Sequence, residues 1–180
     1  GTVWAIEVVH GGQPDRAHKA AEAAFTELER IDRLMSEWKP ESPVSAINDA
    51  AGKGMVEVPA ELRALIERSI RYSETSGGAF DITWRGMRHI WHFDDRFEVP
   101  TPQAVEKARA LVNFREIRVE GNRVGLARAG MSIGLGGIAK GYAIDRAAAV
   151  LRDLGMADFL VDGGGDILVS GAKAGRPWRL

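Results

Sequence analysis

Residues 131–145 read Met-Ser-Ile-Gly-Leu-Gly-Gly-Ile-Ala-Lys-Gly-Tyr-Ala-Ile-Asp, and the rest of the chain is organised around this stretch. The pattern predicts a short apolar strand, a glycine turn and a helix that opens near Lys140. The first N–H groups of a helix have no partner within it, so a helix start attracts anions. Two interpretations stay open: Lys140 contacts a phosphate, or it is a solvated lysine at a strand–turn–helix corner. The stretch is not a Walker A loop, because neither Ser nor Thr follows the lysine.

The composition of the 180-residue chain predicts one globular domain over residues 1–180. Lys plus Arg (24) nearly balance Asp plus Glu (25), so the net charge favours neither nucleic acid nor an anionic membrane. The sequence contains no cysteine, which excludes disulfides and thiol chemistry within this stretch. The absence fits an extracytoplasmic enzyme that avoids stray oxidation, but many cytosolic proteins share it. It opens in a strand-like stretch without a signal peptide, so we expect that any leader has been left out or removed.

Hydrophobic periodicity and turn residues predict alternating helices and strands. Strands are expected at Val3–Val9, Phe159–Val161 and Ile167–Val169, a hairpin at 116–127, and helices from Pro14 to Met35, from Pro59 to Ser76, from Thr101 to about Val112 and from near Lys140 to Leu154. The apolar face of the first helix comprises Ala17, Ala21, Ala24, Phe25, Leu28, Ile31 and Met35, and we expect it to be core. Residues 35–48 read as a loop broken by Pro40 and Pro43, and residues 79–83 as an extended segment.

Several side chains have both a functional and a structural interpretation. Trp38, in a polar loop, either caps the preceding helix or stacks on a flat ligand. Asp81 either caps a turn or anchors the polar edge of a ligand. Asp162 and Asp166 enclose three glycines, and this segment either forms a tight bend between strands or binds a cation or a polar ligand. His89 and His92 are three residues apart; surface or packing roles are the alternative to a metal pair.

Four stretches occur in the order of a known family. They are residues 35–38 with 45–48 (MSEW…SAIN), 77–83 (GGAFDIT), 135–145 (LGGIAKGYAID) and 160–167 (LVDGGGDI). The chain resembles the ApbE-type FAD:protein FMN transferases, or flavin transferases, over its whole length. Members are considerably longer, so we expect this sequence to be an incomplete N-terminal portion of the full enzyme. The expected architecture is α+β, an antiparallel-rich sheet flanked by helices, with the flavin in a cleft between the two glycine-rich stretches.

The resemblance implies an extracytoplasmic, often lipid-anchored enzyme of the periplasm or the outer face of the cytoplasmic membrane. With Mg²⁺ it would cleave FAD, transfer FMN to a Thr or Ser hydroxyl of a partner flavoprotein and release AMP. Some relatives hydrolyse FAD to FMN and AMP and some only hold it, so a pyrophosphatase or a flavin carrier is the alternative. A further rival is an inert fragment whose site is completed by another segment. No nucleic-acid partner is expected.

The resemblance also implies roles for individual residues. Trp38 is similar to the aromatic residue that stacks on the isoalloxazine, and Lys140 to a pyrophosphate contact. Gly137 is similar to the position whose carbonyl ligates magnesium. The remaining FAD contacts implied are Ala79, Phe80, Asp81 and Gly134, while no catalytic residue is assigned.

Two departures from the family pattern bear on these roles. Gly134 stands where the family usually has an aspartate, so a polar contact to FAD is absent at that position. The family's carboxylate and threonine magnesium ligands lie in a C-terminal part beyond this sequence. We therefore predict that the chain alone has an incomplete metal site.

Overall fold

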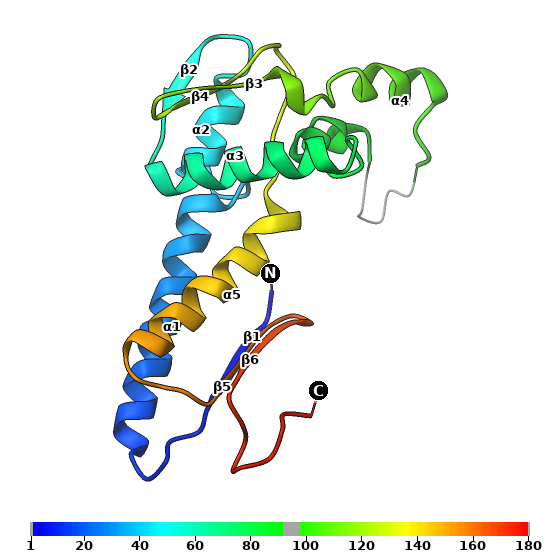
Figure 1. Cartoon of the computed structure of the whole chain (residues 1–180). Coiled ribbons are helices and arrows are strands. Elements are labelled where there is room, and N and C mark those ends of the chain that lie inside the picture. The colour runs from blue at the N-terminus through cyan, green and yellow to red at the C-terminus, as the bar shows by residue number, and fades with distance from the viewer. Residues whose placement is uncertain (1, 92–97, 180) are drawn as a thin grey trace. The chain divides into compact units, whose positions relative to one another are not determined.

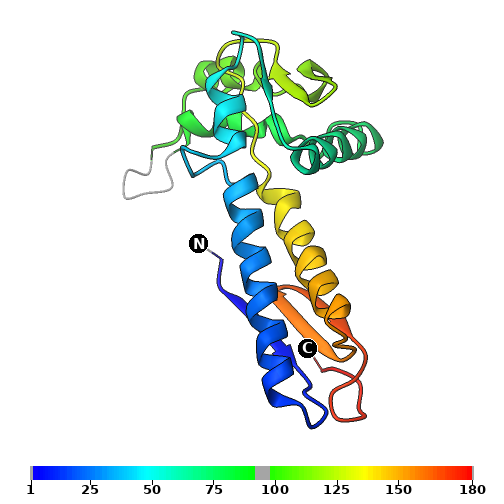
Figure 2. The same cartoon turned by 90° about the vertical axis from the view of Figure 1, so that its left-hand side faces the viewer.

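The computed structural model describes residues 2–91 and 98–179, in which helices and antiparallel strands form two compact units. One unit comprises residues 1–33 and 138–180, and the other comprises residues 34–137. Figure 1 colours the elements along the chain and Figure 2 gives a second view. The predicted α+β class, with antiparallel sheets and helices, is confirmed. The assignment of residues 1–180 to one domain stays a prediction.

The unit of residues 1–33 and 138–180 contains a three-stranded antiparallel sheet. Its strands are β1 (Trp4–Val8), β5 (Phe159–Gly163) and β6 (Asp166–Ser170), in the order β1-β5-β6. Two long helices, α1 (Pro14–Met35) and α5 (Gly136–Asp153), run side by side in both views (Figures 1 and 2). The helix α5 packs on the sheet, because Cδ1 of Ile144 lies 3.2 Å from where a Cβ on Gly163 would be.

The predicted apolar face of α1 is confirmed with one exception. Ala17, Ala24, Leu28, Ile31 and Met35 are buried, and Ala21 is half-buried. Phe25 was expected in this core but is 39% exposed, whereas Ala20 is buried. Phe25 follows Ala24 by one residue, which rotates it about 100° away from the stripe that the helical repeat points inward.

The tight bend predicted at residues 162–166 is the turn between β5 and β6. Gly164 and Gly165 have φ values of +64° and +96°, a region that glycine enters without steric cost. The Asp162 carboxylate accepts a hydrogen bond from the Gly165 N–H at 2.8 Å. Asp162 therefore stabilises the turn of a two-residue hairpin.

The unit of residues 34–137 contains a second antiparallel sheet and most of the short helices. The sheet has the order β2-β4-β3 and is made by β2 (Met55–Glu57), β3 (Ile117–Glu120) and β4 (Arg123–Leu126). The predicted hairpin is formed by β3 and β4 around Gly121. The helices are α2 (Pro43–Asp49), α3 (Ala60–Thr75), α4 (Pro102–Arg109) and the 3₁₀ helices η1 (Ile82–Ile90) and η2 (Phe114–Glu116).

The prediction of a loop over residues 35–48 is wrong in its second half, because α2 begins at Pro43. Proline at the first position of a helix loses no intrahelical hydrogen bond, and its fixed φ suits the helix. Ser42 precedes it as the N-cap, and its Oγ accepts a hydrogen bond from the Ser45 N–H at 3.0 Å. The proline that reads as a breaker in the sequence therefore starts a helix.

The extended segment predicted at residues 79–83 ends at Asp81, because η1 begins at Ile82. The helix predicted from Thr101 to about Val112 is α4, which ends earlier, at Arg109. His92, one member of the histidine pair, lies outside the described residues.

The short strand predicted at the start of the 131–145 stretch is absent, because residues 131–135 join neither sheet. The Asn48 side chain replaces a strand partner: its Nδ2 donates to the Ile133 carbonyl at 3.0 Å, and its Oδ1 accepts from the Ile133 N–H at 2.8 Å. The Gly134 N–H donates to the Ile82 carbonyl at 2.8 Å. The helix α5 then opens at Gly136, so Lys140 is its fifth residue rather than its start.

Candidate functional site

The side chain of Trp38 lies in a turn after α1 and is 62% exposed. Arg88 of η1 stacks on its ring, with the guanidinium carbon 3.5 Å from the ring centroid, and Arg85 lies 5.9 Å from the same centroid. A guanidinium over a tryptophan face is a favourable cation–π arrangement that orients the ring. Of the two alternatives for Trp38, an exposed and oriented ring is the arrangement that stacking on a ligand requires.

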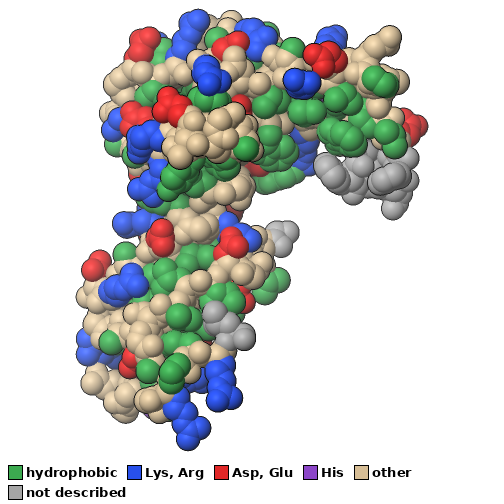
Figure 3. All heavy atoms as spheres, turned by 45° about the vertical axis from the view of Figure 1, so that its right-hand side comes forward, with side chains coloured by type: hydrophobic (Ala, Val, Ile, Leu, Met, Phe, Trp, Pro, Cys, Tyr) green, Lys and Arg blue, Asp and Glu red, His purple; other side chains and the backbone are tan. Residues whose placement is uncertain are grey.

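Exposed aromatic side chains recur in the unit of residues 34–137. Its described residues include the partly exposed rings of Trp38, Tyr72, Trp84 and Trp91. In the view of Figure 3, hydrophobic side chains gather on the face of this unit that is turned to the viewer. Flat apolar surface of this kind suits a flat ligand.

Phe80 and Gly137, predicted to line the flavin and metal sites, lie next to each other. Cε2 of Phe80 is 3.3 Å from where a Cβ on Gly137 would be, so a side chain there would push the ring back by a few tenths of an ångström. Phe80 also meets Tyr72 edge to face, with ring centroids 6.4 Å apart. Ala79, beside Phe80 in the chain, is exposed. The contact between Phe80 and Gly137 thus brings the stretch of residues 77–83 next to the start of the stretch of residues 135–145.

The Asp81 carboxylate is the N-cap of η1. One oxygen accepts hydrogen bonds from the N–H and the hydroxyl of Thr83, at 2.8 and 2.6 Å. The other accepts from the Phe114 N–H at 2.9 Å. The capping alternative therefore describes this carboxylate in the structure, and its contact with flavin stays a prediction.

Gly134 lies against a buried carboxylate that sequence reasoning did not single out. A Cβ at this position would lie 3.1 Å from Oε1 of Glu37, 3.2 Å from Cζ2 of Trp84 and 3.3 Å from Cδ of Arg85. Glu37 is only 8% exposed, and its main-chain carbonyl accepts from Arg85 Nη2 at 3.1 Å. The absence of a side chain at Gly134 thus leaves room for Glu37.

Lys140 belongs to the unit of residues 1–33 and 138–180, where its Nζ lies 3.1 Å from an oxygen of Asp166. The side chains are 32% and 55% exposed, so the pair is accessible to water. An ion pair this exposed contributes little to stability. Lys140 is therefore available to exchange Asp166 for another anion, and its pyrophosphate contact stays a prediction.

The magnesium prediction rests on the carbonyl of Gly137 alone. Among the described residues, no group of three or more His, Cys, Asp or Glu side chains could hold a metal ion. Magnesium requires near-octahedral oxygen coordination, usually with one or two carboxylates. The incomplete metal site therefore stays a prediction.

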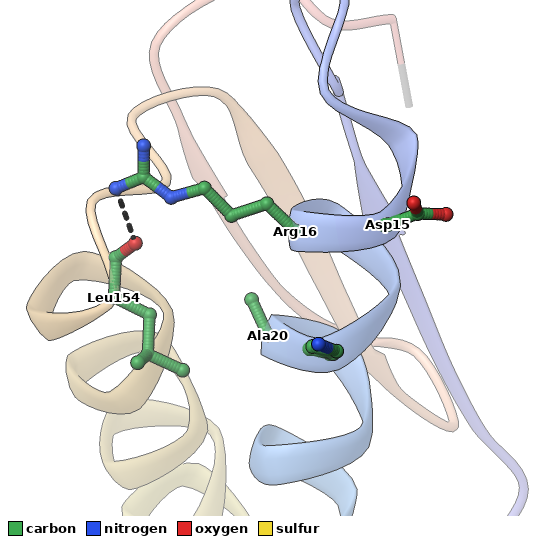
Figure 4. Close-up of a pocket in the computed structure, with 5 residues that line it drawn as sticks. Asp15, Arg16, Ala20 and Leu154 are labelled. Carbon is green, nitrogen blue, oxygen red and sulfur yellow. Dashed lines mark hydrogen bonds between the residues drawn. The ribbon is translucent and has the colours of Figure 1, made fainter.

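A surface hollow lies elsewhere in the described part of the chain. It has a volume of about 420 Å³ and is lined by Asp15, Arg16, Lys19, Ala20 and Leu154 (Figure 4). Arg16 Nη2 donates to the Leu154 carbonyl at 2.9 Å, which satisfies a terminal carbonyl after α5. No predicted site residue lines this hollow, so we assign it a structural role.

The residues that sequence reasoning missed are Glu37, Arg85, Arg88 and Asn48. Glu37 and Asn48 lie inside quoted family stretches, and Glu37 directly precedes Trp38, which was chosen. Arg85 and Arg88 are three residues apart on η1, and this spacing puts both near one ring. No pattern in the sequence pairs them with Trp38, because they lie 47 and 50 positions away.

No helix among the described residues has the length and apolar character needed to cross a membrane.

Comparison with known proteins agrees with the resemblance of the sequence. The ApbE family profile matches residues 1–180. The FAD:protein FMN transferase of Treponema pallidum is 33% identical over 183 residues, which cover 97% of this chain and 51% of that protein. The protein of the same name from Klebsiella pneumoniae is 29% identical, with 100% and 53% covered.

Solved structures of the same family share the fold. The flavin transferase ApbE of Vibrio cholerae aligns with a TM-score of 0.90 at 26% identity, covering 100% of this chain and 60% of the other. The ApbE protein of Thermotoga maritima aligns with a TM-score of 0.82 at 28% identity, covering 98% and 61%. The chain spans about half the length of the relatives it matches. From the whole-length family match and the shared fold, we conclude that the chain belongs to the ApbE family.

Proposed function

We propose that this chain carries the flavin-binding part of an enzyme that transfers FMN from FAD to a Thr or Ser hydroxyl of a partner flavoprotein. The observation that carries the proposal is the cluster in residues 34–137, where the exposed ring of Trp38 is held by Arg88 and Phe80 lies on Gly137. Relatives of the chain are named FAD:protein FMN transferase. An exposed, oriented indole suits the isoalloxazine, a large flat ring.

In the proposed reaction, the acceptor hydroxyl oxygen attacks the phosphorus of the FMN half of FAD. A new P–O bond forms, the P–O bond of the pyrophosphate bridge breaks, and AMP leaves while the hydroxyl proton passes to solvent. Lys140, with Nζ 3.1 Å from Asp166, would exchange that carboxylate for a pyrophosphate oxygen. A cation at this place offsets the charge that develops on the phosphate oxygens.

Magnesium dependence belongs to the proposal for the whole protein. The Gly137 carbonyl is one oxygen donor of the type that magnesium takes. The further ligands would come from outside these 180 residues, so we assign no step to the metal here. For the same reason we propose that the chain alone binds flavin but does not complete turnover.

We further propose an extracytoplasmic location, with a lipid anchor outside this chain. The absence of cysteine supports this location, because compartments outside the cytoplasm are oxidising and a chain without cysteine has no thiol to be oxidised there. Labelling intact cells with a membrane-impermeant reagent would test the location, and protection of the protein from the reagent would contradict it.

A flavin carrier or an FAD pyrophosphatase is the second candidate. Gly134 favours it, because the family usually has an aspartate there and this chain has no side chain. A carrier needs the ring-binding cluster but no acceptor hydroxyl. A pyrophosphatase uses water in place of that hydroxyl and releases both FMN and AMP.

A titration with FAD, with and without Mg²⁺, tests these proposals. Flavin fluorescence reports binding, and chromatography reports AMP. Binding without AMP release is the expected result for the chain alone. Magnesium-dependent AMP release would show that the metal site is complete, against our prediction. If no flavin binds, the proposed function itself is wrong.

A further inference from the structure

Glu37 is a largely buried residue whose carboxylate has no protein partner among the described residues. Only 8% of the residue is exposed. In residues 2–91 and 98–179, the structure has no hydrogen bond or ion pair to the Glu37 carboxylate; the contact from Arg85 goes to the main-chain carbonyl. Neither carboxylate oxygen is among the fully buried polar atoms that lack a partner, so the oxygens keep some accessible surface while the rest of the residue is buried. A carboxylate placed in this way can accept a donor from a ligand.

The backbone around Glu37 leaves room for the carboxylate. Its Oε1 lies 3.1 Å from where a Cβ of Gly134 would be, so a side chain at that position would shift the carboxylate by a few tenths of an ångström. The Gly134 backbone is held by its N–H bond to Ile82. Arg85 is held on the other side, donating to the Ser132 hydroxyl at 3.0 Å and to the Glu37 carbonyl at 3.1 Å.

The neighbouring groups indicate what kind of ligand the carboxylate would meet. Trp38 follows Glu37 directly in the chain and offers an exposed ring. The Trp84 ring flanks the same glycine. A ligand suited to both features is a flat aromatic ring that carries an N–H donor at its edge. The isoalloxazine has one such donor in its imide, between two carbonyl groups, and the adenine of FAD has an exocyclic amine.

We propose that Glu37 accepts a hydrogen bond from the imide N–H of the isoalloxazine and thereby positions the flavin against Trp38. The inference rests on the proposed flavin-binding function and deepens it. Glu37 would take the place of a polar contact that Gly134 cannot make. Hydrogen bonds to charged groups are among the stronger ones, so losing this bond weakens flavin binding roughly 10- to 100-fold.

The test uses riboflavin and N3-methylriboflavin, whose methyl group replaces the imide proton, with flavin fluorescence as the readout. The unmodified chain binds riboflavin roughly 10- to 100-fold more tightly than the methylated compound. The variant Glu37→Ala binds riboflavin more weakly than the unmodified chain by about the same factor. It binds N3-methylriboflavin about as well as riboflavin, because the acceptor of the imide proton is gone. Glu37→Gln, which keeps the shape and an acceptor oxygen but not the charge, falls between them. Such a cycle isolates one pairwise contact.

Two further variants serve as a negative control and as a rescue. Glu41→Gln alters an exposed carboxylate four residues away and leaves both affinities unchanged. Gly134→Asp, combined with Glu37→Ala, puts a carboxylate back beside the vacated space and restores riboflavin binding together with the methylation penalty. In the unmodified background Gly134→Asp crowds Glu37 and weakens binding.

The outcomes separate the inference from the proposed function. Suppose that the unmodified chain binds riboflavin and that N3-methylation lowers the affinity of Glu37→Ala as much as that of the unmodified chain. The inference about Glu37 is then wrong, and the proposed function stands. If AMP competes with riboflavin and only AMP binding depends on Glu37, the donor is the adenine amine and the imide assignment fails. If the unmodified chain binds no flavin, both proposals fail.

Discussion

The guanidinium carbon of Arg88 lies 3.5 Å from the centroid of the Trp38 ring. This contact joins the turn after α1 to η1 and leaves 62% of Trp38 exposed. Arg88 covers one face of the ring, so a stacked ligand would use the exposed remainder or displace the guanidinium. The contact orients the ring before a ligand arrives, which lowers the entropy lost on binding.

Trp38→Leu should weaken riboflavin binding about 2- to 12-fold, because an aromatic pair contributes about 0.5–1.5 kcal/mol beyond its buried area. Arg88→Met should weaken it less, since the ring remains but is no longer held. Fluorescence titration measures both. Phe25→Leu, which removes an exposed aromatic ring of α1 outside this surface, serves as the control. Equal losses for Trp38→Leu and Phe25→Leu would contradict the role of Trp38.

The pair of Lys140 and Asp166 should control the preference for FAD over riboflavin. Lys140→Met removes a charge from the pyrophosphate and should abolish part of that preference. Asp166→Asn removes a competing carboxylate and should raise FAD affinity by about fivefold, because two charges 4 Å apart in water interact by about 1 kcal/mol. Glu7→Gln, at the exposed ion pair with Lys173, is the control. Weaker FAD binding by Asp166→Asn would show that Asp166 positions the lysine instead.

Acid should weaken the packing of α1 on α5 through Glu27. The hydrogen bond from Arg30 (2.7 Å), reinforced by that from Arg146 (2.9 Å), lowers the Glu27 pKa from 4.5 to about 2, although burial opposes this shift. Above pH 4.5 the carboxylate is ionised in both folded and unfolded chains, and its stabilisation is complete. Between about pH 4.5 and 2 the unfolded chain takes up the proton first, so that stabilisation is lost as the pH falls.

Urea unfolding at pH 7, 4 and 3 measures this effect. Glu27→Gln should lower the free energy of unfolding at pH 7 by about 1.5–3 kcal/mol, the range for hydrogen bonds to charged groups. The variant should also show a shallower loss of stability below pH 4.5. Glu29→Gln, at a side chain 72% exposed and 3.8 Å from Arg33, should change little. Parallel pH profiles for Glu27→Gln and the unmodified chain would refute the prediction.

Asn48→Ala should destabilise the unit of residues 34–137 by about 2–6 kcal/mol. The substitution leaves the N–H and the carbonyl of Ile133 without partners, and each buried unpaired group costs about 1–3 kcal/mol. Because Gly134 follows Ile133, flavin binding should weaken as well. Thermal unfolding measures stability, and Asn122→Asp in the exposed β3–β4 turn is the control. A loss below about 0.5 kcal/mol, the usual limit for a surface change, would contradict this role.

Local patterns predicted most elements because their causes are local. The apolar repeat of α1, the Thr101 cap of α4 and the glycine turn between β3 and β4 each act over a few residues. The loop predicted at Pro43 is wrong because proline is common both at helix breaks and at the first position of a helix. The Ser42 N-cap before it distinguishes the second case from the first. Residues 131–135 were misread as a strand because an apolar run does not show what satisfies its backbone.

The sequence by itself determined the family, the α+β class and the stretches from which the candidate site is drawn. It did so because helix periods, caps and glycine turns depend on neighbouring residues. The tertiary structure decided that Glu37 fills the space beside Gly134, that Arg88 covers Trp38 and that Lys140 pairs with Asp166. These contacts join residues 26 to 97 positions apart, and no local pattern encodes which side chain fills a space that the folded backbone creates.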